Sequence, residues 1–118
     1  MKRTLTIDDY LDHMRRSVGD VFTVTDQMSL DAFERDRVAQ LATVKAIENI
    51  GEAAGCVQRD FSEFAETESS VAWRNWRAVR NRLTHAYFDV DLEIVWNVVQ
   101  KEIPALERAL TIILAKRS

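Results

Sequence analysis

Hydrophobic residues recur every three or four positions along most of the chain, which is the spacing of amphipathic helices. A first helix is predicted over residues 7–18, because Thr6 is a suitable N-cap and acidic residues follow it in the first turn. Gly19 is a suitable end for this helix, and residues 20–28 are interpreted as a connector. Ser29 then resembles a second N-cap, and a long helical pattern follows it.

Small residues gather on the later turns of that long pattern. Gly51, Ala54 and Gly55 lie within five positions of one another, and small residues let another backbone approach closely. Ordinary helix packing explains such a group, and a more specific role is the alternative. Glu48 and Glu52 share one helical stripe nearby. We interpret both as structural.

The second half of the chain predicts further helices and no strand. Residues 58–70 are polar and acidic, which indicates a loop or a short irregular helix. A third helix is expected to begin near residue 71 or 72 and to run into the segment "RNRLTHAYFDVD" at 80–91. Asp91 suits the N-cap of a fourth helix. Pro104 suits the first turn of a last helix, where its missing N–H costs nothing.

Composition agrees with a helical chain. Three glycines and one proline among 118 residues are few, whereas turn-rich folds use many of both. We therefore predict an all-α fold, an up-and-down bundle of four to five helices forming one domain over residues 1–118. A net charge of −3 disfavours a broad electrostatic grip on nucleic acid but leaves room for a local basic site.

Compartment and cofactor follow from what the sequence lacks. Cys56 is the only cysteine, so an internal disulfide or a thiol-rich zinc site is ruled out and a reducing compartment is expected. No apolar run reaches the roughly 18 residues of a membrane span, and no cluster suggests a metal ligand set. We expect a cytoplasmic protein without membrane association, cofactor or bound metal.

The segment at 80–91 concentrates the groups that phosphodiester chemistry uses. On a helical wheel Asn81 and His85 share a face, and Tyr87 rejoins the stripe of Arg80 if the helix continues. Histidine exchanges protons near neutral pH, and the arginine fork matches a phosphate. His85 could deprotonate a 2′-hydroxyl or protonate the leaving oxygen while Arg80 stabilises charge on the phosphoryl group. Cleavage of this kind needs the 2′-hydroxyl and would select RNA over DNA.

Acid–base cleavage in two steps is easiest with two proton-transfer groups, and this segment contains one histidine. A two-fold dimer would bring a second copy of the site. His13 is the alternative partner, although nothing in the sequence places it near His85. Arg77 and Arg82 either guide RNA phosphates or pair with the acidic stretch at 58–70. The three tryptophans are Trp73, Trp76 and Trp96. They either stack on RNA bases or belong to the core or a dimer contact, and we favour the core or dimer contact.

Three segments resemble one known family. "AIENIGEAA" at 46–54, "WRNWRAVRNRLTHAYFDVDLEIVW" at 73–96 and "EIPALERAL" at 102–110 are similar to elements of the HepT branch of the HEPN superfamily. The family motif is an arginine, four residues beginning with a polar one, and then His-x-Tyr. Every defining position is filled in this chain, by Arg80, Asn81, His85 and Tyr87.

The resemblance implies a function and a partner. Proteins of this type are metal-independent endoribonucleases and the toxins of type VII toxin–antitoxin pairs, and their motifs meet in a cleft between two subunits. Arg80 and His85 would be the catalytic pair, assisted by Asn81. Glu52 lies in the first of the similar segments, and the resemblance leaves a cleft-facing role open for it. The usual partner is a nucleotidyltransferase antitoxin that transfers AMP to the tyrosine, here Tyr87. The expected substrate is RNA, either tRNA or mRNA. The alternative is a HEPN module without catalysis that docks a nucleotidyltransferase or a nucleotide.

Overall fold

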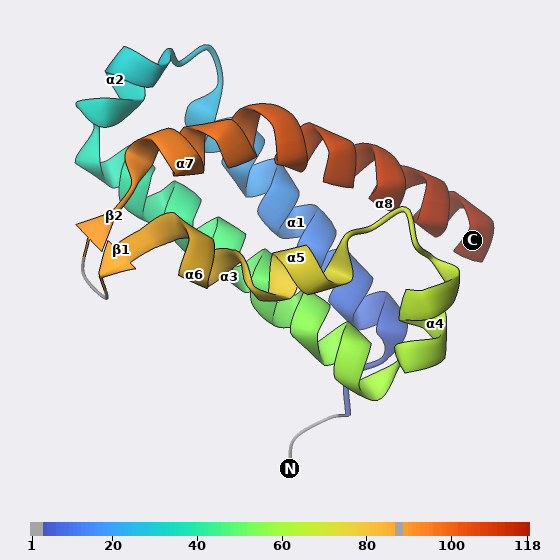
Figure 1. The fold of residues 1–118 in the computed structure, drawn as a ribbon. Helices are drawn as coiled ribbons and strands as arrows, with labels where there is room; N and C mark the ends of the chain where they lie inside the picture. The colour runs from blue at the N-terminus through green and yellow to red at the C-terminus, as the bar shows by residue number, and fades with distance from the viewer. Residues whose placement is uncertain (1–3, 87–88) are drawn as a thin grey trace.

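The computed structural model describes residues 4–86 and 89–118, with the backbone only at residues 85 and 86. Helices α1 (Ile7–Thr25) and α3 (Arg37–Asp60) form the centre of the molecule and pack against each other along their length. The short helices α5 (Trp73–Arg77) and α6 (Val79–Leu83) lie across α3, as Figure 1 shows. The all-α fold class predicted from the sequence is confirmed.

The C-terminal half closes the bundle. Helix α7 (Leu92–Asn97), a π-helical turn (Val98–Glu102) and α8 (Ile103–Arg117) follow one another without a loop and form one long run beside α1 (Figure 1). The buried core is shared by these elements; its largest fully buried side chains include Leu11, Met14, Phe33, Ile47, Ile50, Leu83, Ile103, Leu110 and Ile113. Within the described ranges, no helix is both long and apolar enough to cross a lipid bilayer.

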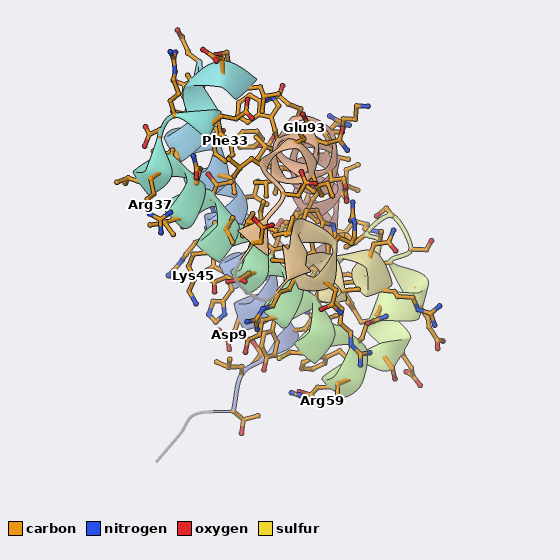
Figure 2. The ribbon with its side chains drawn as sticks, turned by 60° about the vertical axis from the view of Figure 1, so that its left-hand side comes forward. Asp9, Phe33, Arg37, Lys45, Arg59 and Glu93 are labelled. Atoms are coloured by element: carbon orange, nitrogen blue, oxygen red, sulfur yellow. The ribbon has the colours of Figure 1, made fainter. Side chains whose placement is uncertain are left out.

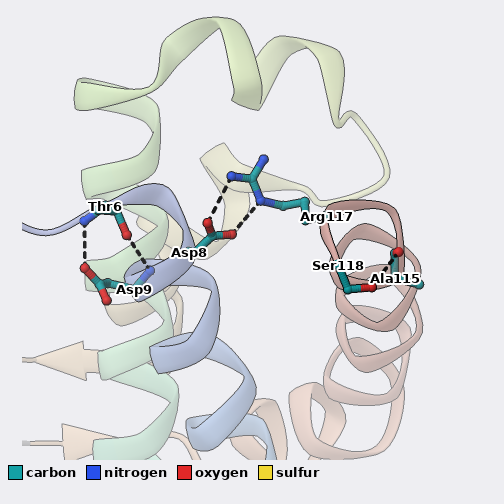
Figure 3. Close-up of polar contacts among 6 residues, drawn as sticks. All are labelled: Thr6, Asp8, Asp9, Ala115, Arg117 and Ser118. Carbon is teal, nitrogen blue, oxygen red and sulfur yellow. Dashed lines mark hydrogen bonds and ion pairs between the residues drawn. The ribbon is translucent and has the colours of Figure 1, made fainter.

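Polar contacts fasten the ends of the bundle (Figure 3). The Thr6 hydroxyl accepts the Asp9 N–H at 3.2 Å, and the Asp9 carboxylate accepts the Thr6 N–H at 2.8 Å, a capping box that satisfies two donors at the start of α1. The Asp8 carboxylate accepts hydrogen bonds from Arg117 of α8 at 2.6 and 3.2 Å. This contact with the arginine lowers the pKa of Asp8. The first turn of α1 and the last turn of α8 therefore meet on one side of the molecule.

The first helix is longer than the sequence predicted. Gly19 does not end α1, which continues to Thr25. The apolar stripe also continues, with Val18 and Val21 buried on the turns either side of Gly19. A glycine inside a helix costs about 1 kcal/mol relative to alanine, and burial of one valine contributes more than that. The prediction that residues 20–28 form a connector is therefore wrong for 20–25.

The long pattern after Ser29 is two helices rather than one. Ser29 caps α2 (Leu30–Glu34) as predicted, with its hydroxyl accepting the Ala32 N–H at 3.1 Å. The chain then turns at Arg35, and Asp36 caps α3 by accepting the Ala39 N–H at 2.9 Å. A second cap within a continuous apolar pattern is hard to recognise, because aspartate also occurs on exposed helix faces.

The acidic stretch is mostly helical. Helix α3 extends to Asp60, and α4 (Ser62–Thr67) follows it directly. Of the two alternatives left open for residues 58–70, a loop or a short irregular helix, the structure has a short α-helix, and residues 58–60 belong to the end of α3. The Trp73 indole N–H donates to the Glu68 carbonyl at 3.0 Å, which ties the loop after α4 to the start of α5.

The last helices follow the predicted caps. The Asp91 carboxylate accepts the N–H groups of Glu93 and Ile94, at 3.0 and 3.2 Å, and begins α7 as predicted. Pro104 does lie in the first turn of α8, but no break precedes it. The wider π turn joins α7 to α8, and the Ile103 N–H donates to the Val98 carbonyl five residues back, so the helical run continues up to the proline.

Candidate nuclease site

A close approach between α5 and α3 creates the groove that carries the arginines. A Cβ atom added to Gly51 of α3 would lie 2.5 Å from the Trp76 carbonyl oxygen and 3.0 Å from Val79 Cγ1. Both distances are shorter than van der Waals contact, so only glycine lets the backbone of α5 come this near. Gly55, one turn later, lies under the aliphatic part of Arg77, whose Cγ would be 3.4 Å from an added Cβ. The small residues of the long helix therefore have a specific packing role.

The groove beside this contact has a volume of about 460 Å³ and a polar lining. Helix α3 contributes Lys45, Glu48, Asn49 and Glu52, which are spaced at i, i+3, i+4 and i+7 and therefore share one face. Arg77 and Arg80 enter from α5 and α6 on the other side; the full lining is Lys45, Glu48, Asn49, Gly51, Glu52, Gly55, Arg77, Val79 and Arg80. Figure 2 shows Lys45 projecting from the outer side of α3, in the same direction as Arg37.

Within the predicted motif, the structure describes a side-chain contact for Arg80, and this side chain is highly exposed. Its side chain is 80% exposed, and its Nε lies 3.5 Å from Oε2 of Glu48. Asn81, the next residue, is also exposed, and its backbone N–H donates to the Ala78 carbonyl at 3.1 Å. The structure therefore places both the predicted arginine and the predicted polar residue at the surface of α6, but only Arg80 lines the groove.

His85 does not belong to a helix, which corrects the helical-wheel argument. The third helix breaks at Ala78 and ends at Leu83, two residues before the histidine. Thr84–Ala86 form strand β1, which pairs antiparallel with β2 (Asp89–Val90). Consequently Asn81 and His85 do not share a helical face, and the prediction that the chain has no strand is wrong.

The physical reason for the strand is local. The Asp91 N–H donates to the Leu83 carbonyl at 2.7 Å, so the chain folds back on itself directly after α6. Thr84 and Val90, which pair across the two strands, are both β-branched, and such residues favour extended backbone. The predicted modification site, Tyr87, and the side chain of His85 lie outside the part of the chain that the structure describes.

Arg82 faces a different part of the molecule from Arg80. Its guanidinium donates two hydrogen bonds to the Glu102 carboxylate, at 2.9 and 2.6 Å, and this contact raises the pKa of Arg82. Glu102 belongs to the π turn, so the pair ties α6 to the run that joins α7 and α8. The partner is thus not the acidic stretch that the sequence suggested. The groove that Arg82 lines is also separate, being bordered by Val71, Trp76 and Leu106 among others.

The other candidate side chains are distributed elsewhere. Trp73 and Trp76 are buried, and the ring of Trp96 packs against Phe33 with centroids 5.2 Å apart, which confirms the preferred core role. His13 lies on α1 in a neighbouring groove. Its ring packs edge-on against the ring of Tyr10, with the two ring centroids 6.2 Å apart. Among the described residues, no three His, Cys, Asp or Glu side chains come together in an arrangement that could hold a metal ion.

Glu52, for which the family resemblance leaves a cleft-facing role open, does line the groove, but the rest of the contribution of α3 was not predicted. Lys45 was not singled out, and Glu48 was interpreted as structural, yet both face Arg80. The signal was present as a run of polar residues at helical spacing along 45–52. Only the packing of α5 on Gly51 shows that this polar stripe borders the arginines rather than open solvent.

Comparison with known proteins gives the family. The model of the HepT-like family, described as ribonuclease HepT-like, matches residues 7–113. A protein named "Probable ribonuclease HepT" from Thermococcus cleftensis is 31% identical over 99 residues, which cover 84% of this chain and 87% of that protein. A relative from Caldanaerobacter subterraneus subsp. tengcongensis, named "Putative RNase TTE0752", is 35% identical over 107 residues, covering 91% and 93%. No solved structure matches significantly. With a family model that spans most of its length and relatives of similar size, this chain belongs to the HepT-like ribonuclease family.

Proposed function

We propose that this chain is a metal-independent endoribonuclease whose catalytic residues are Arg80, Asn81 and His85. The observation that carries the proposal is the guanidinium of Arg80, exposed at a polar groove, five residues before a histidine that lies two residues after the end of the same short helix. Membership of a ribonuclease family supports the same reaction class.

The reaction would be an internal transesterification. The 2′-oxygen of the RNA attacks the adjacent phosphorus, the bond to the 5′-oxygen breaks, and a 2′,3′-cyclic phosphate and a 5′-hydroxyl result. One imidazole removes the 2′-hydroxyl proton and another donates a proton to the leaving 5′-oxygen. Arg80 stabilises the negative charge that builds up on the phosphoryl oxygens. Asn81 donates a hydrogen bond to the phosphate or orients the imidazole.

A homodimer would supply the second imidazole. Two-fold symmetry brings identical surfaces together, so two copies of Arg80 and His85 would face one shared cleft. Arg77 borders the same groove as Arg80 and is proposed to guide the RNA backbone. Arg82 was predicted to share that task, but its bidentate bond to Glu102 favours a structural role.

The biological setting that fits this activity is a type VII toxin–antitoxin pair in the cytoplasm. The chain would be the toxin, and a cognate nucleotidyltransferase would neutralise it by transferring AMP to Tyr87. Tyr87 follows His85 by two residues, so an added phosphate would place negative charge at the cleft and repel the RNA backbone.

Cleavage of RNA in the presence of EDTA tests the function. Purified chain without its partner is expected to cut tRNA or mRNA fragments in excess EDTA and to leave 2′,3′-cyclic phosphate ends. A matched DNA oligonucleotide should stay intact, because it lacks the attacking 2′-hydroxyl. Loss of cleavage on chelation would contradict the metal-independent mechanism. RNA binding without cleavage would instead favour the docking module without catalysis.

Modification of Tyr87 is expected to add the mass of one or more AMP groups. The chain would be co-expressed with a nucleotidyltransferase encoded beside it and weighed intact, and Tyr87→Phe would be the control, since phenylalanine lacks the acceptor oxygen. The adduct should be absent from Tyr87→Phe, and the modified chain should no longer cut RNA. An adduct of the same mass on the phenylalanine variant would place the modification on another residue.

A further inference from the structure

We infer that Glu48 is a positioning residue that orients the guanidinium of Arg80 for the phosphate. This inference rests on the proposed ribonuclease function. The contact between them joins Oε2 of Glu48 to Nε of Arg80, at 3.5 Å. A guanidinium held at Nε keeps its other edge, formed by the two terminal nitrogens, for a bidentate contact with phosphate oxygens. The 80% exposure of the Arg80 side chain agrees with an open outer edge.

The two partners differ in how firmly they are held. Glu48 belongs to the 24-residue helix α3, its side chain is only 33% exposed, and its neighbour Ile47 is fully buried. Arg80 belongs to α6, which has five residues and no side-chain cap at its N-terminus. A long arginine side chain on such a short helix samples many rotamers. The carboxylate therefore restricts the arginine, rather than the reverse.

The pair has little to contribute to folding. Ion pairs between exposed side chains contribute little to stability, because water screens them and ordering long side chains costs entropy. A purely structural role for Glu48 is thus disfavoured. A second role to distinguish is competition, in which Glu48 merely occupies Arg80 until RNA displaces it. Competition and positioning predict opposite changes in kcat when the carboxylate is removed.

Glu52 provides the matched control. It lies one helical turn after Glu48 on the same face of α3 and borders the same groove. Replacing either residue by glutamine removes one negative charge from the groove and preserves the side-chain shape. Only Glu48 has an ion pair with Arg80 in the described part of the chain.

Steady-state cleavage of a short RNA by the full chain tests positioning. Glu48→Gln is expected to lower kcat about 10-fold, because a misdirected catalytic group loses the advantage of orientation. Its KM should fall or stay unchanged, since the groove has lost a charge that repels phosphate. Glu52→Gln should lower KM for the same reason and should leave kcat unchanged. An unchanged or increased kcat in Glu48→Gln would overturn the inference and support competition.

A double substitution tests whether Glu48 acts through Arg80. Lysine in place of Arg80 keeps the charge but lacks the Nε donor, so Glu48→Gln should cost no further kcat in an Arg80→Lys background. An equal loss in both backgrounds would show that Glu48 acts independently and would overturn the inference. Thermal unfolding of Glu48→Gln should match the wild type; a marked fall in Tm would assign the pair to the fold instead.

A measurement independent of cleavage separates this inference from the proposed function. The NMR order parameter of the Arg80 Nε–Hε vector reports how firmly the guanidinium is held. It should fall in Glu48→Gln and remain unchanged in Glu52→Gln. If it falls as expected while the wild type cuts no RNA, the ribonuclease proposal fails but the positioning contact stands. If it does not fall, the positioning contact fails whether or not RNA is cleaved.

Discussion

Replacement of Arg80 or His85 by alanine is expected to abolish RNA cleavage and to leave the fold intact. Loss of a proton-transfer group typically costs a factor of about 10²–10⁴ in rate. Loss of one donor to a developing oxyanion costs about 10²–10³. Because Arg80 is 80% exposed, its removal leaves no buried group unpaired and Tm should stay close to the wild-type value.

The matched control for Arg80 is Arg35. Its side chain is 74% exposed and is paired with Asp31 at 2.8 Å, so it resembles Arg80 in exposure and pairing, but it follows α2 and does not line the groove. Arg35→Ala should cut RNA at nearly the wild-type rate. Cleavage that persists in both Arg80→Ala and His85→Ala would reject the assigned site.

Mixing wild-type chains with inactive ones extends this test to the dimer. If both imidazoles of a dimer are needed, only dimers of two intact chains are active. Refolding equal amounts of wild type and His85→Ala together should then leave roughly a quarter of the activity of the same total amount of wild-type chain, since pairing is random. Two independent sites would leave half. The remaining activity therefore distinguishes a shared cleft from separate sites.

Replacement of Gly51 by alanine is expected to destabilise the protein by about 1–3 kcal/mol, the usual cost of overpacking a filled interior. The added Cβ would lie 2.5 Å from the Trp76 carbonyl oxygen, a backbone atom that cannot move by changing a rotamer. Relief requires α5 to move away from α3, and α6 follows α5 directly. Urea unfolding should therefore show a lower midpoint, and RNA cleavage should fall because Arg80 is displaced.

The other two glycines provide the controls, since all three lie inside helices. Nothing lies within 4 Å of a Cβ added to Gly19, so Gly19→Ala should raise stability by about 0.5–1 kcal/mol through helix propensity. At Gly55 the nearest atom would be Arg77 Cγ at 3.4 Å, an ordinary contact with a flexible side chain, so Gly55→Ala should be tolerated. Equal stability changes at all three positions would contradict a steric role for Gly51.

Periodicity and caps were predictable because their causes lie within a few residues. The apolar stripes, the N-caps at Thr6, Ser29 and Asp91, and the core role of Trp73 follow from helical spacing and from side-chain oxygens next to free N–H groups. The motif from Arg80 to Tyr87 was recognisable for the same reason, since it is a local pattern of residue types.

The departures share another cause. Helix α1 continues through Gly19 because burial of Val18 and Val21 outweighs the cost of an interior glycine. The strand at Thr84 forms because Asp91 returns to the Leu83 carbonyl, and Arg82 pairs with Glu102, which lies 20 residues later. The strand and the Arg82 contact depend on residues outside the local window, and such contacts leave no periodic trace. The apolar stripe through Val18 and Val21 is visible in the sequence, but how far these valines are buried depends on the packing of other helices.

The sequence by itself determined that the chain is helical, where several of its helices begin, and that an arginine and a histidine stand five residues apart with a tyrosine two residues later. The tertiary structure alone decided what surrounds the arginine. Gly51 lets α5 approach α3, and that approach turns the polar stripe from Lys45 to Glu52 into the wall of a groove facing Arg80. The physical reason is steric: a missing methyl group sets the separation of two backbones, and that separation decides which charges meet.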